Sequence, residues 1–489
     1  MVKETKQGKN ENFSDWFTWI CGEDGAKLSD LRYNVQGFIV ERPWGFKIIR
    51  KIYELLEKEF EADGHEPMLF PTVIPQSNLE TEKEHAGFAP DVFWVTERGD
   101  EKLEEKWALR PTGEAAIYPM YSLWLRSYND LPFKAYQSRI TVFRNEKTTR
   151  PFLRGREFNF MEAHNVFNSH EEVMVQIKSD MKIMEKVIIK ELKLPILFLK
   201  RPQWDKFKGA DNTYCADTIH PDGRKNQMSS THDLGENFSK AFKIMVKDGN
   251  GEEKYVWQTC FGPGIWRIMA ALIAVHGDDK GLVLPVIVAP IKVIIVPVVF
   301  SSKPEEMKEI LGYSKEVLEK LSNAGWKSQI DTTQNSPGYK FNEWEMMGVP
   351  LRIEIGPKEY TERKLTIARR TDKQKTTVGF NELISEIHKQ ALIVDDQIEK
   401  RSKSYFEKKV LDAKTYEKTK EMIEKDKCYV HVPFCSNEMD GKKCADKIKE
   451  ETGADIGGIV PFSNRKPKAD KCIICGRPAK EYVYIGKSL

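Results

Sequence analysis

The sequence lacks an uninterrupted apolar run of the length that a membrane span needs. Its longest apolar stretch, residues 282–300, contains three prolines and a lysine, and residues of this kind argue against a spanning helix. The first 14 residues are polar and contain no apolar segment like that of a signal peptide. We therefore expect a cytoplasmic protein without membrane contact.

An excess of either charge is also missing. The 77 lysines and arginines nearly balance the 74 aspartates and glutamates, for a net charge of +3, so a nucleic-acid surface would have to come from the local arrangement of charges. Cysteine is scarce, with 8 residues in 489, yet five lie at or after Cys428. In a cytoplasmic protein this crowding favours a metal site over disulfides.

The chain does have the material for several folded domains. Its length of 489 residues exceeds what one core supports, and 40% of the residues are apolar. The pattern predicts an amphipathic helix over 43–62, an apolar strand over 68–75, and an antiparallel sheet from 107 to 166. After Pro290, alternating strand and helix patterns, including a strand over 293–299 and a helix over 304–323, predict a separate α/β domain.

A charged segment follows that domain. Residues 393–426 are helical in pattern. A charged helix of this kind is either a solvated connector or an RNA-binding arm, and both interpretations remain open.

The densest group of polar residues lies between Arg139 and His164. Arg144 and Glu146 are two positions apart, so on a strand they would share a face. An arginine and a carboxylate so placed are suited to the phosphate and the adenine amino group of a nucleotide. A strand over 154–164 would present Arg154, Phe160, Glu162 and His164 together; the alternative is a salt-bridge ladder on a surface edge strand.

Three ordered segments resemble the motifs of class II aminoacyl-tRNA synthetases. Phe143-Arg-Asn-Glu146 with Arg156-Glu-Phe158 resembles motif 2, residues 70–75 resemble the end of motif 1, and Arg267 resembles the motif 3 arginine. Further segments resemble prolyl-tRNA synthetases of the archaeal and eukaryotic type over nearly the whole chain: Phe88-Ala-Pro-Asp-Val92, Arg110-Pro-Thr-Gly-Glu114, and residues 276–285, 337–345 and 348–357.

Three other interpretations stay open at this point. A synthetase for threonine, serine, glycine or histidine would share the three motifs. A non-catalytic tRNA-binding paralogue would be expected to have lost Arg144, Glu146 or Arg267, and all three are present. A zinc-dependent RNA-binding protein with a vestigial catalytic fold is the third.

The resemblance implies a multidomain α/β protein. The expected parts are a class II catalytic core with an antiparallel sheet over 1–285, an α/β anticodon-binding domain over 286–395, and a small C-terminal α/β zinc-binding domain over 396–489. It also implies proline activation with ATP and transfer to tRNA, without an inserted editing domain between His164 and Arg267.

The resemblance further implies roles for single residues. The catalytic residues are Arg144, Arg267 and Glu146. The residues expected to bind proline are Thr112, Glu114, Arg144, Phe88, Phe160, His164 and His232. Those expected to bind ATP and Mg²⁺ are Arg144, Glu146, Arg154, Gln227, Ser230 and Arg267.

Expected contacts with tRNA, metal and a second subunit complete the list. The anticodon of proline tRNA would be read by Glu343, Arg352, Glu354 and Lys358, with Phe341 and Trp344 either stacking on bases or filling the core. The tight Cys472-x2-Cys475 spacing is typical of zinc sites, and the family likeness adds Cys435 and Cys444 as ligands of a structural Zn²⁺. The helix over 43–62 and the strand ending at Pro75 either fill the core or, as the likeness to motif 1 implies, form a homodimer interface.

Overall fold

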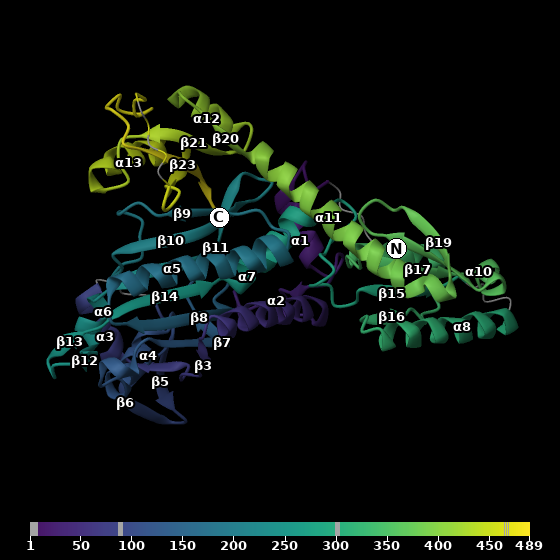
Figure 1. Ribbon diagram of the computed structural model, residues 1–489, viewed down its shortest axis with the longest axis horizontal. Coiled ribbons are helices and arrows are strands. Elements are labelled where there is room, and N and C mark those ends of the chain that lie inside the picture. The colour runs from purple at the N-terminus through teal and green to yellow at the C-terminus, as the bar shows by residue number, and fades with distance from the viewer. Residues whose placement is uncertain (1–7, 87–90, 299–303, 464, 466, 468) are drawn as a thin grey trace.

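A computed structural model of the protein describes residues 8–86, 91–298, 304–463, 465, 467 and 469–489. A large central sheet with its helices forms one part, a smaller sheet lies at one end, and the C-terminal residues lie against the central sheet (Figure 1). Among the described residues, no helix has the length and apolar character that a membrane span requires.

The central sheet has 11 strands, with a main order of β20-β21-β23-β11-β14-β8-β7-β3. Its middle is antiparallel, from β11 through β14 and β8 to β7, as the sequence predicts. Its strands are β3 (Glu66–Pro67), β7 (Phe133–Phe143), β8 (Glu157–Phe167), β9 (Leu197–Lys200), β10 (Asn212–Ile219), β11 (Arg224–Gly235), β14 (Trp257–Pro263), β20 (Val410–Asp412), β21 (Tyr429–Phe434), β22 (Ala454–Gly458) and β23 (Glu481–Ser488).

The C-terminal residues belong to the same sheet. Strand β23 runs parallel to β11, with Arg224 opposite Lys487 and Lys225 opposite Ser488. This pairing places the end of the chain beside β11 (Figure 1).

Helix α2 (Pro43–Ala62) supports the sheet and has the predicted bounds. Proline at the first helical position is compatible with the missing N–H there. The apolar stripe of α2 is buried within the chain, and the Phe60 ring stacks on Phe261 of β14 with centroids 5.1 Å apart. The expected strand over 68–75 is wrong in extent, because only β4 (Val73–Pro75) forms there.

Smaller elements surround this core. They are α1 (Phe13–Cys21), β1 (Ser29–Asp30), β2 (Val40–Glu41), α3 (Gln76–Ala86), β5 (Trp94–Arg98), β6 (Glu101–Leu109), α4 (Glu114–Trp124), α5 (His170–Met184), α6 (Asn237–Phe242), β12 (Met245–Lys247), β13 (Glu253–Tyr255) and α7 (Ile265–Ala271). Helix α4 is a correction to the all-β expectation for 107–166. It contains Pro119, and proline inside a helical pattern obscures the periodicity.

A five-stranded mixed sheet forms the second domain, in the order β16-β15-β17-β18-β19. Its elements are β15 (Val293–Pro297), α8 (Pro304–Asn323), β16 (Ser328–Ile330), α9 (Pro337–Met346), β17 (Leu351–Ile355), α10 (Pro357–Glu362), β18 (Lys364–Arg369) and β19 (Lys375–Gly379). The predicted bounds of α8 are confirmed. The predicted strand over 293–299 ends at Pro297, and Val299 lies outside the described residues.

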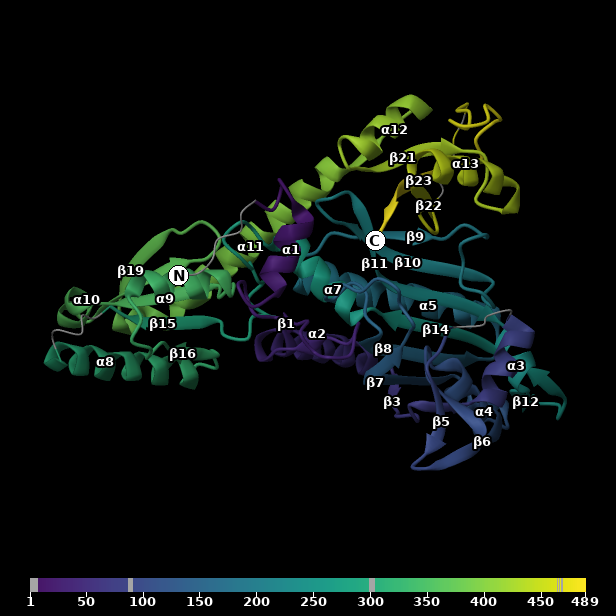
Figure 2. The same cartoon turned by 180° about the vertical axis from the view of Figure 1, so that it is seen from behind.

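The long helix α11 (Leu383–Lys409) joins the second domain to the C-terminal part (Figure 2). Asp395 accepts a hydrogen bond from the backbone N–H of Val286 at 2.9 Å, and the Arg401 guanidinium donates to the backbone oxygen of His276 at 2.7 Å. The helix crosses residue 395 without a break, and the domain boundary there stays a prediction. Helices α12 (Tyr416–Glu424) and α13 (Lys442–Thr452) follow.

Arg201 connects the central strands to the C-terminal part through a buried network. Its Nη1 and Nη2 atoms lie 2.8 and 2.7 Å from the two carboxylate oxygens of Asp217, and Nη1 also donates to the backbone oxygen of Gly457 at 2.7 Å. The Tyr429 hydroxyl donates to the same carboxylate at 3.2 Å. A Cβ at Gly457 would overlap that hydroxyl, so this close approach requires glycine.

Replacing Asp217 tests the network. We expect Asp217→Ala to lower the free energy of unfolding by about 3–5 kcal/mol, because it leaves the Arg201 charge buried without its carboxylate. Urea denaturation measures the change. The matched control is Asp396→Ala, which removes an exposed carboxylate 2.8 Å from Lys400 and is expected to cost about 0.5 kcal/mol or less. Equal losses in both variants would contradict the prediction.

Candidate functional site

One cleft with two chemically different ends lies on the central sheet. Its two cavities measure about 410 and 300 Å³. The wall that they share is formed by Arg144, Phe158, Phe160, Arg201, Asp205, Gln227, Ser230 and Gly262. Strand β8 supplies both aromatic rings and β11 supplies Gln227 and Ser230. These two strands flank β14 in the sheet, so the sheet brings together residues that are distant in the sequence.

The larger cavity is lined by cations. Arg144 follows β7, Arg154 precedes β8, and Arg267 lies on α7; all three face the cavity together with Glu146. The expectation that Arg144 and Glu146 lie on a strand is wrong, because β7 ends at Phe143. The loop is held by backbone hydrogen bonds, from Arg144 N–H to Arg156 O at 2.9 Å and from Glu146 N–H to Arg144 O at 2.8 Å.

The three guanidinium groups repel one another. Burial and the charges of Arg154 and Arg144 lower the pKa of Arg267 to about 10. Arg154 donates to the backbone oxygen of Leu489 at 2.5 Å and lies 3.8 Å from the Glu146 carboxylate. A polyanion would relieve this repulsion, so the larger cavity is suited to a chain of phosphates.

Lys225 is a wall residue that sequence reasoning missed, and Leu489 lines the same cavity. The Lys225 side chain is buried, and burial and the Arg201 charge lower its pKa. It faces the cavity from β11, at the position that pairs with Ser488 of β23. The signal for Lys225 is the pairing of β11, near the middle of the chain, with β23 at its C-terminal end, which no local pattern contains.

The smaller cavity has two buried carboxylates, Glu114 and Glu162, in its wall and is called the acidic end below, although Arg144, Arg201 and Lys206 also line it. Thr112, Glu114, Phe160 and His232, all predicted, line it with Glu162 and Cys260, which were not predicted as binding residues. Glu114 begins α4, and its carboxylate accepts a hydrogen bond from the Thr112 hydroxyl. Burial raises the pKa of Glu114. A Cβ at Gly113 would overlap the Glu162 carboxylate, which explains the glycine of this Thr-Gly-Glu segment.

His164 lies behind the wall of this cavity. Its Nε2 atom is 3.1 Å from Glu162 Oε2, and its Nδ1 atom is 2.9 Å from the Tyr118 hydroxyl. Burial alone would lower the pKa of His164, but the Glu162 hydrogen bond and charge raise it. The structure therefore brings His164 to the pocket as support for Glu162 and not as a wall residue.

His232 and Phe88 complete the predicted pocket. His232 Nδ1 lies 2.9 Å from the Thr213 hydroxyl, and burial lowers the pKa of His232 to about 3. The imidazole is therefore neutral at physiological pH. Phe88 lies outside the described residues.

A third cavity, of about 180 Å³, lies in the second domain. Arg352 lines it and donates to Glu354 at 2.8 Å, and Lys375 lies 2.7 Å from the other oxygen of Glu354. Glu343, Glu354 and Lys358 do not form its wall, and Lys358 is exposed on α10. Wall cations that the sequence reasoning missed are Arg369, Arg370, Lys373 and Lys375.

The two aromatic residues near this cavity have different contacts. The Trp344 indole donates to Asp331 at 2.8 Å, and its ring packs on Trp44 of α2 at 6.3 Å. Phe341 lies under the Arg352 guanidinium at 4.0 Å. Trp344 therefore connects the two domains, whereas Phe341 supports the arginine.

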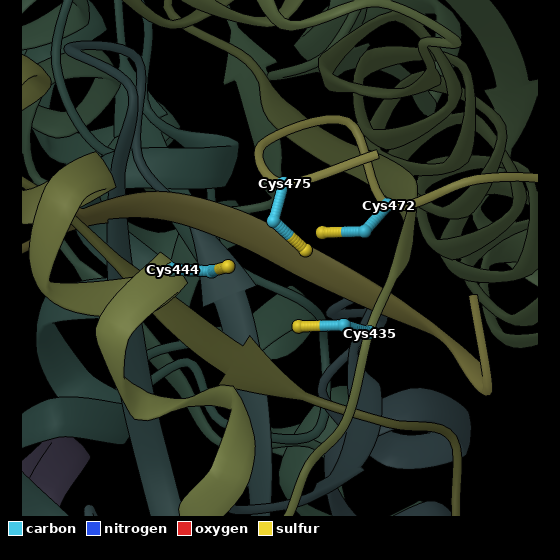
Figure 3. A group of neighbouring side chains, drawn as sticks. All are labelled: Cys435, Cys444, Cys472 and Cys475. Carbon is cyan, nitrogen blue, oxygen red and sulfur yellow. The ribbon is translucent and has the colours of Figure 1, made fainter. Parts of the chain in front are cut away.

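Four cysteine sulfurs converge in the C-terminal part (Figure 3). Cys435 follows β21, Cys444 lies on α13, and Cys472 and Cys475 lie on the loop before β23; all four sulfurs are within 4.8 Å of one another. Tetrahedral Zn²⁺ with Zn–S distances of about 2.3 Å would place its sulfurs about 3.8 Å apart. The donor set therefore fits zinc, and Cys428 is not part of it.

Comparisons with families match three successive regions of the chain. Residues 93–276 match the tRNA synthetase class II core domain (G, H, P, S and T), residues 292–390 match an anticodon binding domain, and residues 416–489 match the prolyl-tRNA synthetase C-terminal domain.

Full-length relatives agree with these matches. The chain is 49% identical over 483 residues to the proline–tRNA ligase of Thermofilum pendens, covering 98% of each chain. It is 40% identical to that of Thermococcus kodakarensis, covering 96% of each.

Solved structures have the same fold. The prolyl-tRNA synthetase of Giardia lamblia in complex with prolyl-adenylate superposes with a TM-score of 0.93, at 35% identity and 98% coverage of both chains. That of Cryptosporidium parvum, complexed with halofuginone and AMPPNP, has a TM-score of 0.92 at 30% identity, covering 100% of this chain and 97% of that one.

Proposed function

The chain belongs to the prolyl-tRNA synthetase family, and from this premise we propose how its residues activate proline with ATP and charge tRNA. The observation that carries the proposal is the position of Arg144, which lines both ends of the cleft. One guanidinium can then contact the carboxylate of proline in the acidic end and the α-phosphate of ATP in the cationic end.

The chemistry needs no protein nucleophile. The proline carboxylate attacks the α-phosphorus and pyrophosphate leaves; the terminal ribose hydroxyl of tRNA then attacks the prolyl carbonyl and AMP leaves. Arg144 and Arg267 stabilise negative charge on the phosphates, while Glu146 binds the adenine amino group. The protein contributes by positioning and by preorganised charge.

The acidic end binds the amino acid. Glu114 and Thr112 accept the secondary ammonium of proline, and Glu162 adds negative charge beneath it. Phe160 and neutral His232 form the flat wall against the ring. An acidic, partly apolar pocket of this kind favours a small cationic ring over larger side chains.

Mg²⁺ would enter with ATP. It prefers hard oxygen ligands and keeps several from water and phosphate. Gln227 and Ser230 face the cationic cavity, and their side chains carry oxygens of the kind that would hold this ion. When bound, it neutralises charge on the phosphates.

The second domain would bind the anticodon of proline tRNA. Bases of a single-stranded loop are read on their polar edges. Arg352 and Lys375 line the cavity, and both contact the Glu354 carboxylate. We assign Glu343 and Lys358 to its approaches. Like other charging enzymes, the protein would act in the cytoplasm.

Proofreading of the charged tRNA would fall to another protein. Residues 165–266, all described, form strands β9 to β14, helices α5 and α6, and their connections. An inserted editing domain would need roughly 100–200 residues of its own. The segment is therefore used by the synthetic site itself.

Replacing Arg144 tests the assignment. We expect Arg144→Ala to lower proline-dependent ATP–pyrophosphate exchange by about a hundredfold or more, because a contact with developing charge is worth about 3 kcal/mol. The matched control is Arg98→Ala, which removes an exposed arginine paired with Glu101 and should leave exchange unchanged. Near-normal exchange in a folded Arg144→Ala protein would reject the proposal.

The C-terminal cysteines generate a metal prediction. After dialysis against a weak chelator we expect one tightly bound Zn²⁺ per chain, with a structural role because four thiolates leave no open position. Cys472→Ser should lose it. Cys428→Ser, which replaces a buried cysteine outside the cluster, should keep it. Elemental analysis decides, and a zinc-free native protein would contradict the site.

We also propose that the protein is a homodimer, but that its subunits contact each other through a different surface from the one expected from the sequence. The stripe of α2 is already buried within the chain, whereas Leu69 and Val73 of the motif 1 segment are exposed, Leu69 by 80%. Leu69→Asp is expected to weaken self-association by at least about tenfold, because it places a charge in an apolar contact. Sedimentation equilibrium measures this, with Leu392→Asp on α11 as the control. A wild-type monomer at assay concentrations would refute the proposal.

A further inference from the structure

A histidine and two cavity-wall residues form a second group of metal-binding side chains, far from the four cysteines. Glu114, His164 and Cys260 are buried, and one ligand atom from each lies within 4.8 Å of the other two. They come from three elements, α4, β8 and β14. Strand pairing sets Cys260 directly opposite His164, so their proximity follows from the register of the sheet.

The spacing is close to that of a tetrahedral zinc site. Cys260 Sγ lies 3.9 Å from His164 Nε2. Zinc bonds of about 2.3 Å to sulfur and 2.0 Å to nitrogen would place these two atoms about 3.5 Å apart. A shift of a few tenths of an ångström is therefore enough for both to bind one ion.

The surroundings of the histidine suit a metal ligand. Metal-bound histidines usually donate their other ring N–H to a fixed acceptor, which holds the ring in place. The Tyr118 hydroxyl lies 2.9 Å from His164 Nδ1 and supplies that acceptor. On the other side, Glu162 Oε2 is 3.1 Å from Nε2, so a second carboxylate lies beside the group, although it is not one of the three mutually close ligands.

The charge balance also fits a divalent ion. Glu114 and Glu162 are each only 2% exposed, and a Cys260 thiolate would add a third negative charge. Zn²⁺ together with buried Arg110, which contacts Glu162 through Gln137, would neutralise these three. The mixed sulfur, nitrogen and oxygen donors favour Zn²⁺ over Mg²⁺ or Ca²⁺.

We propose that Zn²⁺ binds to Glu114, His164 and Cys260 at the floor of the smaller cavity and thereby excludes proline. The cavity provides access, because Glu114, Glu162 and Cys260 all line it. The exclusion rests on the function proposed above, in which Glu114 accepts the proline ammonium. An ion bound to Glu114 would repel the proline ammonium and occupy its space, so it is a competitive inhibitor of amino-acid binding.

The first experiment measures Zn²⁺ binding directly, without an activity assay. Equilibrium dialysis of the full chain, with the four-cysteine site filled, measures Zn²⁺ taken up at buffered micromolar concentrations. We expect a second equivalent in the wild type and in Cys21→Ser, which replaces a buried thiol elsewhere, and its loss in Cys260→Ser. A single equivalent in all three proteins would overturn the proposal, as would a second one unaffected by Cys260→Ser.

Competition is tested on the wild type and so does not depend on how a variant folds. Saturating L-proline should displace the second equivalent. In proline-dependent exchange, free Zn²⁺ at ten times its dissociation constant should raise the apparent KM for proline about elevenfold with kcat unchanged. A fall in kcat alone, or no displacement by proline, would overturn the exclusion. Exchange without added zinc tests the proposed function separately.

Discussion

The buried pairing of Arg201 with Asp217 is the interaction on which the geometry of the cleft depends. A buried guanidinium must have its donors satisfied. Arg201 uses them on Asp217 of β10, on Gln227 of β11 at 2.8 Å, and on Gly457 of β22. Three strands from two regions are thus held at fixed positions around one charge. The amide of Gln227, which faces both cavities, is oriented by the same contact.

Opposite charges are separated along the cleft and are left incompletely neutralised by the protein. Arginines gather at one end and buried carboxylates at the other, with Arg144 between them. This arrangement costs stability, since like charges repel and buried acids are desolvated. In the function proposed above, ATP and the ammonium of proline would offset this cost on binding. The same carboxylates would also attract other cations to the pocket.

The sequence predicted those parts of the structure that are determined by residues close together in the chain. Pro43 and Pro304 mark the starts of α2 and α8. Together with the apolar spacing that follows, they predicted the bounds of both helices correctly. Linear motifs located Arg144 and Arg267. By contrast, Lys225 and Cys260 reach the cleft only through pairing between distant strands; Cys260 and His164 are 96 positions apart. Helix α4 was missed because of its internal proline.

The place of β23 in the central sheet has a consequence for the order of synthesis. A chain emerges from the ribosome N-terminus first, so β11, β10 and β14 are made long before β23, the last strand that pairs with β11. Until β23 arrives, the edge at Arg224 and Lys225 is open, and open edges recruit strands from other chains. Only two residues of β11 pair with β23. The edge of β11 that stays open during synthesis is therefore very short, which limits the chance that strands of other chains pair with it.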